Sequence, residues 1–102
     1  MAYRDDSLWN DDNEIKCLIL FKYLQKSNFP RGAQKKYCEE LARISGLDTG
    51  SISAKVSNFK SLAGINAPSN YSKNSKYIYE LYSNHTIKEL EDLVGWAFLP
   101  TK

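Results

Sequence analysis

Apolar residues recur every three or four positions along most of this chain, the spacing that places them on one face of an α-helix. A first helix is predicted over about 11–26, with Asn10 or Asp11 as its N-terminal cap. Pro30 and Gly32 are typical of a chain break, so this helix should end before them. Its wide apolar face comprises Ile15, Leu18, Ile19 and Leu24.

Two further helices are predicted in the middle of the chain, separated by a very short connection. The first covers about 33–45 and is followed by Gly46, which suits a left-handed helix end. The second starts from a cap at Asp48 or Thr49 and runs to about Leu62. Their inward faces comprise Tyr37, Cys38, Leu41 and Ile44 in the former and Ile52, Val56 and Phe59 in the latter.

A loop and two more helices are predicted in the last third of the chain. The polar stretch 66–75 is expected to be a loop, and apolar spacing over 77–82 indicates a short helix. Thr86 and Glu89 have the spacing of a capping box and begin a fifth helix, which should stop before the last proline. Because no pair of alternating strands is found, the chain is predicted to form one all-α domain of about five helices over residues 1–102.

Charge is unevenly distributed behind a formal net charge of +2. Residues 1–15 carry one base and five acids, residues 16–76 eleven bases and three acids, and residues 77–102 two bases and four acids. A basic middle between acidic ends favours an anionic partner for one face of the molecule. The alternative is a solvated surface on which the charges happen to segregate.

Two helices joined by three or four residues that include a glycine are the layout of a helix-turn-helix, predicted here over about 33–62. In this interpretation the helix over about 49–62 enters the major groove of double-stranded DNA. Its polar positions carry hydroxyls, an amide and cations, which suit contacts with base edges and phosphates. The candidate DNA-contacting residues are Thr49, Ser51, Ser53, Lys55, Asn58 and Lys60, with Lys35, Lys36, Lys73 and Lys76 around them.

The same spacing is compatible with an ordinary helical bundle, since paired amphipathic helices with short turns are common there. Asn58 equally suits a buried structural amide. A monomer of this size would also bury only a modest DNA interface, so binding is expected to need a homodimer or a partner domain.

One set of residues runs through the first two thirds of the chain: Trp9, Glu14, Tyr23, Gly50, Ser51, Ile52, Lys55, Val56, Asn58, Phe59 and Leu62. This set resembles the N-terminal helical region of bacterial and phage HNH endonucleases. That region has the form Trp-x-x-x-x-Glu, followed by Gly-Ser-Val-x-x-Lys-Leu-x-Asn-Phe. The resemblance covers about residues 8–65, is most specific over 50–59, and implies a DNA-reading module with Ser51, Ser53, Lys55 and Asn58 as contacts.

The chain departs from that family in its chemistry, and no enzyme is predicted. An HNH nuclease needs histidines for metal binding and water activation, whereas His85 is the only histidine and Cys-x-x-Cys is absent. His85 precedes the capping box and suits a loop or cap, and no second histidine or cysteine lies nearby to bind zinc. Neither a glycine-rich phosphate loop nor a nucleophile elbow is present, so no cofactor is expected.

The cellular compartment of the protein is predicted from two kinds of segment not found in its sequence, a membrane span and a signal peptide. No run of about 18 apolar residues exists, so no membrane span is expected. The first residues have no apolar core typical of a signal peptide. A cytoplasmic protein is therefore expected, with Cys17 and Cys38 as reduced, buried thiols.

A second hypothesis is a small inhibitor or adaptor that binds a protein, such as a phage-encoded inhibitor of a host defence enzyme. Seven tyrosines, several of them near 71–82, would suit an interface of this kind. The acidic residues Asp5, Asp6, Asp11 and Asp12 would then occupy the nucleic-acid site of the target.

Overall fold

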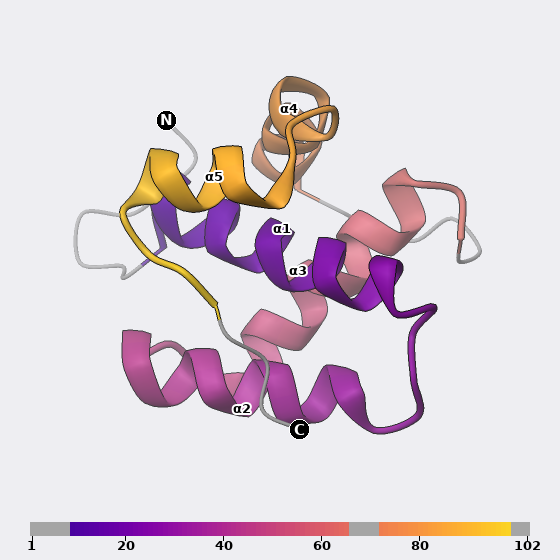
Figure 1. Ribbon diagram of the computed structural model, residues 1–102, viewed down its shortest axis with the longest axis vertical. Coiled ribbons are helices and arrows are strands. Elements are labelled where there is room, and N and C mark those ends of the chain that lie inside the picture. The colour runs from indigo at the N-terminus through magenta and orange to yellow at the C-terminus, as the bar shows by residue number, and fades with distance from the viewer. Residues whose placement is uncertain (1–8, 66–71, 99–102) are drawn as a thin grey trace.

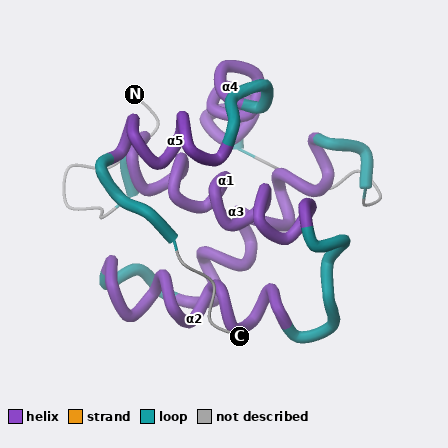
Figure 2. Tube along the Cα trace, in the orientation of Figure 1, coloured by secondary structure: helices purple, strands orange, loops and turns teal. Residues whose placement is uncertain are grey.

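The computed structural model describes residues 9–65 and 72–98, and the regular structure within them is entirely helical (Figures 1 and 2). The all-α prediction is confirmed for this part of the chain. Asp5, Asp6, residues 66–71 of the predicted loop and residues 99–102 lie outside the described residues. The helices are α1 (Asp11–Lys26), α2 (Ala33–Ser45), α3 (Thr49–Leu62), α4 (Lys73–Tyr82) and α5 (Ile87–Val94).

Local hydrogen bonds explain where several of these helices begin and end. The Asn10 side chain accepts from the backbone N–H of Asn13, and Asp48 caps α3 in the same way through Ser51. Thr86 and Glu89 form the predicted capping box at α5. Gly46 ends α2 with φ of +79°, the left-handed conformation that the sequence predicted.

One predicted boundary was wrong. The stretch expected to be loop up to Ser75 becomes helical at Lys73, because the Ser72 side chain accepts from the Ser75 N–H and starts α4 there. The last helix ends at Val94, before the last proline as predicted, because Gly95 takes a left-handed conformation with φ of +66°.

Helix α1 lies at the centre of the molecule and packs against α2, α3, α4 and α5. Its buried side chains point in several directions around the helix, as expected of a helix enclosed by others. Helix α3 packs against α1, α2 and α4, so it is also largely enclosed. The apolar core comprises Ile15, Cys17, Leu18, Ile19, Leu20, Phe21, Leu24, Cys38, Leu41, Leu47, Ile52, Val56, Phe59, Ile78, Leu90 and Phe98.

The two cysteines are core residues, as predicted, and neither forms a disulfide. Burial raises the pKa of the Cys17 thiol well above its usual value and raises the pKa of Cys38 to about 11. Both therefore remain neutral thiols near pH 7 and pack as small apolar groups.

Ile44, predicted on an inward face, is instead about half exposed, and so are Leu81 of α4 and Leu93 of α5. Ile44, Leu81 and Leu93 retain 50%, 45% and 53% of their accessible surface. Figure 1 shows α4, which carries Leu81, at the margin of the fold.

Candidate nucleic-acid interface

Helices α2 and α3 are joined by the three residues 46–48, and their side chains interlock. Leu47 in the connection is buried, which fixes the turn against the core. The Gln34 amide donates to the Ser53 hydroxyl at 3.0 Å and links the start of α2 to α3. The pair forms one packed unit, and α3 is its second helix.

Lys55, a predicted phosphate contact, is held inside the fold. Its Nζ atom lies 3.6 Å from a carboxylate oxygen of the fully buried Glu14, and only 19% of its side chain is exposed. The same ammonium donates to the Ser75 hydroxyl at 3.2 Å and lies 5.3 Å from the centre of the Trp9 ring. Its charge is therefore largely satisfied within the protein, and Lys55 is poorly placed to contact a phosphate.

The Glu14 carboxylate joins three helices. One oxygen accepts from the Ser75 hydroxyl at 2.9 Å, and the other accepts from the Asn74 amide at 2.7 Å. Glu14 is on α1, Lys55 on α3, and the serine and asparagine on α4. A buried carboxylate is stable only with such partners, so this cluster is part of the framework of the fold.

This cluster also accounts for part of the sequence pattern. Trp9, Glu14 and Lys55, three residues of the HNH-like pattern, meet in one set of contacts. Their spacing along the chain thus serves to hold α1 against α3. The partly buried Trp9 ring packs against the apolar core as well as contacting the Lys55 ammonium.

Ser53 and Lys60, also predicted to contact DNA, lie on the side of α3 that faces α2. The Lys60 ammonium donates to the side-chain oxygen of Gln34 at 3.2 Å and lies 5.0 Å from the centre of the Phe29 ring. Gln34 thus binds both residues through its two amide atoms. Because of these contacts, Ser53 and Lys60 are less available to bind base edges or phosphates than the sequence suggested.

The N-terminal turn of α3 carries a carboxylate rather than an open anion site. Asp48 accepts from the Ser51 N–H at 3.0 Å and from its hydroxyl at 3.4 Å. Thr49 is partly exposed, and Asn58 is partly buried. Because an exposed carboxylate repels phosphate, this turn is a weak place for backbone contact.

The remaining predicted lysines are placed quite differently. Lys35 and Lys36 lie in the first turn of α2, Lys73 and Lys76 lie in the first turns of α4, and all four are exposed. Within residues 9–65 and 72–98 their side chains make no ion pair or hydrogen bond. These four residues are called the lysine set. Both helices that carry it pack against α3.

Two structural residues were missed by the analysis of the sequence. Glu14 precedes Leu18 by four residues, and Gln34 precedes Cys38 by four, so both polar residues continue a buried helical stripe. A polar residue in such a position signals a buried hydrogen-bonded contact. That signal was available in the sequence, but the identity of the partners was not.

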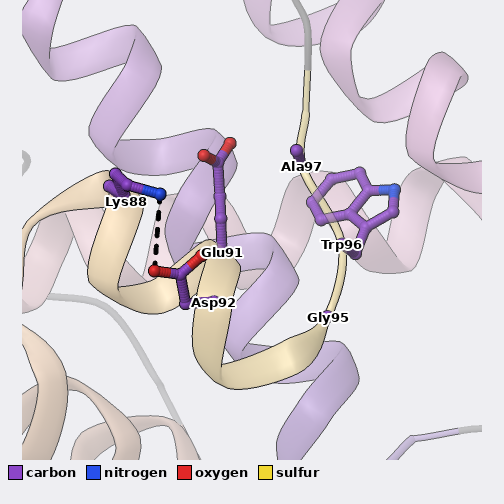
Figure 3. Close-up of a pocket in the computed structure, with 6 residues that line it drawn as sticks. All are labelled: Lys88, Glu91, Asp92, Gly95, Trp96 and Ala97. Carbon is purple, nitrogen blue, oxygen red and sulfur yellow. Dashed lines mark hydrogen bonds and ion pairs between the residues drawn. The ribbon is translucent and has the colours of Figure 1, made fainter.

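Elsewhere the described surface offers little chemistry. A shallow hollow lies between α5 and the segment after it, lined by Lys88, Glu91, Asp92, Gly95, Trp96 and Ala97 (Figure 3). Lys88 and Asp92 pair across it at 3.5 Å, so opposite charges offset each other at its rim. Among the described residues no group of three or more potential ligands is placed to hold a metal ion. None of the helices described is long and apolar enough to span a membrane.

Comparison of the chain with protein-family models, with curated proteins and with solved structures gives no match.

Proposed function

We propose that this protein binds double-stranded DNA, with α2 and α3 as a helix-turn-helix and the lysine set as its phosphate contacts. The observation that supports the proposal is the exposure of these four lysines, without internal partners in the described chain, on two helices that both pack against α3. Because no group within the described chain neutralises these lysines, their charge can attract an external polyanion such as DNA. They would flank α3 as it approaches the duplex.

The placement of the side chains on α3 indicates what kind of binding to expect. Contacts with phosphates position a protein on DNA, and contacts with base edges give sequence specificity. Lys55, Ser53 and Lys60 are engaged within the fold. The proposed binding is therefore dominated by the DNA backbone, with strong dependence on salt and modest dependence on sequence.

The test is a fluorescence-anisotropy titration with duplex DNA at about 50 and 200 mM salt. Each phosphate contact contributes about 0.9 to the slope of log affinity against log salt. The double variant Lys35→Ala/Lys36→Ala should lower that slope by about 1.8. The matched control is Arg43→Ala/Lys88→Ala, which also removes two cations, but from residues already paired with Glu40 and Asp92.

The control should keep a slope close to that of the parent protein. Equal losses in both double variants would show that the lysines on α2 have no special role. Absence of binding by the parent protein at low salt would reject the DNA proposal altogether.

A protein target is the second candidate function, and one observation favours it. Tyr77 and Leu81 lie one turn apart on α4 and are 53% and 45% exposed. Aromatic and apolar residues of this kind form the centres of protein interfaces. Failure of DNA binding would make this face of α4 the proposed contact surface.

A further inference from the structure

The turn between α1 and α2 brings together cations from three helices. Lys26 ends α1, Arg31 lies in the turn, and Lys35 and Lys36 begin α2 (Figure 1, right). The Lys60 ammonium of α3 reaches the same place, because it contacts Phe29 and Gln34. The four exposed cations among them, Lys26, Arg31, Lys35 and Lys36, are called the basic corner. Two of them, Lys26 and Arg31, were not among the residues that the sequence singled out.

The acids nearest to this corner along the chain are Glu39 and Glu40, one helical turn after Lys35 and Lys36 on α2. No carboxylate occurs between Glu14 and Glu39, and none occurs between Asp48 and Glu80. Lys26 and Arg31 are exposed, and their side chains make no ion pair or hydrogen bond within residues 9–65 and 72–98. Their charge is therefore available to an external anion.

The turn that carries these cations is fixed by its own backbone. The Phe29 N–H donates to the Leu24 carbonyl at 2.7 Å, and the Asn28 N–H donates to the Gln25 carbonyl at 3.1 Å. These two bonds close the end of α1 in a Schellman motif, with Asn28 and Phe29 at φ of +62° and +51°. The Phe29 ring packs 6.0 Å from Phe21 and anchors the turn to the core. Arg31 is thus presented from a preorganised support, which lowers the entropy lost on binding.

The residue types exposed at the α1–α2 turn indicate which kind of partner it would bind. The exposed large hydrophobic residues of the described chain all lie outside the α1–α2 turn: Ile44, Ile65, Tyr77, Leu81 and Leu93. Protein interfaces usually contain an apolar or aromatic centre, whereas the sugar-phosphate backbone is recognised mainly by charge. We infer that the basic corner binds the phosphate backbone of double-stranded DNA and extends the proposed interface from α2 to the α1–α2 turn. This inference rests on the proposed function and names a further surface for it.

The experiment compares Lys26→Ala/Arg31→Ala with the parent and with the control Arg43→Ala/Lys88→Ala. All are titrated with a random duplex at several salt concentrations. Removing two phosphate contacts should lower the slope of log affinity against log salt by about 1.8 and weaken binding equally for unrelated sequences. The melting temperature measured by circular dichroism should change little, because both replaced side chains are exposed and unpartnered among the described residues and only Lys26, in the last turn of α1, interacts with a helix dipole.

Three outcomes would overturn the inference. In the first, the parent protein binds DNA and Lys26→Ala/Arg31→Ala shows the same slope of log affinity against log salt as the parent. The basic corner would then not be part of the DNA interface, and the proposed function would stand. A parent that binds no DNA at low salt would reject both. Tighter binding of double-stranded RNA than of DNA with the same sequence would reject DNA as the partner of the corner.

Discussion

Among individual residues, Glu14 is the fully buried acid whose charge most needs bonded partners. Its side chain is fully buried and binds groups from α3 and α4. Since a charged group in the interior is costly without partners, Glu14 and Lys55 must be considered together. Lys55 is thereby assigned to the framework, although its residue type and its position on α3 suggested contact with DNA.

Glu14→Ala should lower the free energy of unfolding by about 3 kcal/mol, measured by urea denaturation. The substitution leaves the Lys55 ammonium without its counter-ion and removes the acceptor for Ser75 and Asn74. The control is Asp12→Ala, which removes an exposed acid from the first turn of the same helix and should cost less than about 1 kcal/mol. Similar losses in the two variants would show that the buried cluster contributes nothing beyond a helix-dipole effect.

At the scale of helices and turns, Gly46 determines how α2 passes into α3. Its φ of +79° is strained for residues with a Cβ atom, so Gly46→Ala should cost about 1 kcal/mol. That loss corresponds to a fall in melting temperature of about 4–8 °C for a domain of this size. Gly46→Asn should cost less, because asparagine tolerates the left-handed conformation. Equal melting temperatures for the parent and the alanine variant would contradict this account of the turn.

Helices and their ends were predictable because their determinants are local. The cap at Asn10, the left-handed Gly46 and the capping box of Thr86 and Glu89 each involve residues within four positions of one another. The start of α4 was missed because the stretch before it is polar, although Ser72 caps it by an equally local bond. Local rules therefore predicted all five described helices and misjudged the start of α4.

The site was harder to predict because its contacts join distant parts of the chain. Lys55 meets Glu14 from 41 positions away, and Ser53 meets Gln34 across 19. Helical spacing shows which side chains share a face, but it does not show which neighbour covers that face. The four lysines on α2 and α4 are exposed, whereas Lys55 and Lys60 on α3 make contacts within the fold.

For the molecule as a whole, the arrangement of charge should matter more than its sum. The formal net charge of +2 is small, so general attraction to DNA is weak and the basic surface must supply the binding. Exposed cations gather at the α1–α2 turn, whereas α5 carries three acids, Glu89, Glu91 and Asp92. Two variants with identical net charge can separate these effects.

Lys36→Glu and Lys88→Glu each change the formal net charge from +2 to 0. Lys36→Glu places a carboxylate within the basic corner and should weaken DNA binding about tenfold at 50 mM salt, through loss of one phosphate contact and repulsion of another. Lys88→Glu acts on the acidic α5 and should change the affinity less than about threefold, because screening attenuates charges more than a Debye length from the duplex. Equal weakening in anisotropy titrations of the two folded variants would mean that net charge governs binding. A larger effect of Lys36→Glu would locate the interaction on the face formed by α2 and the α1–α2 turn.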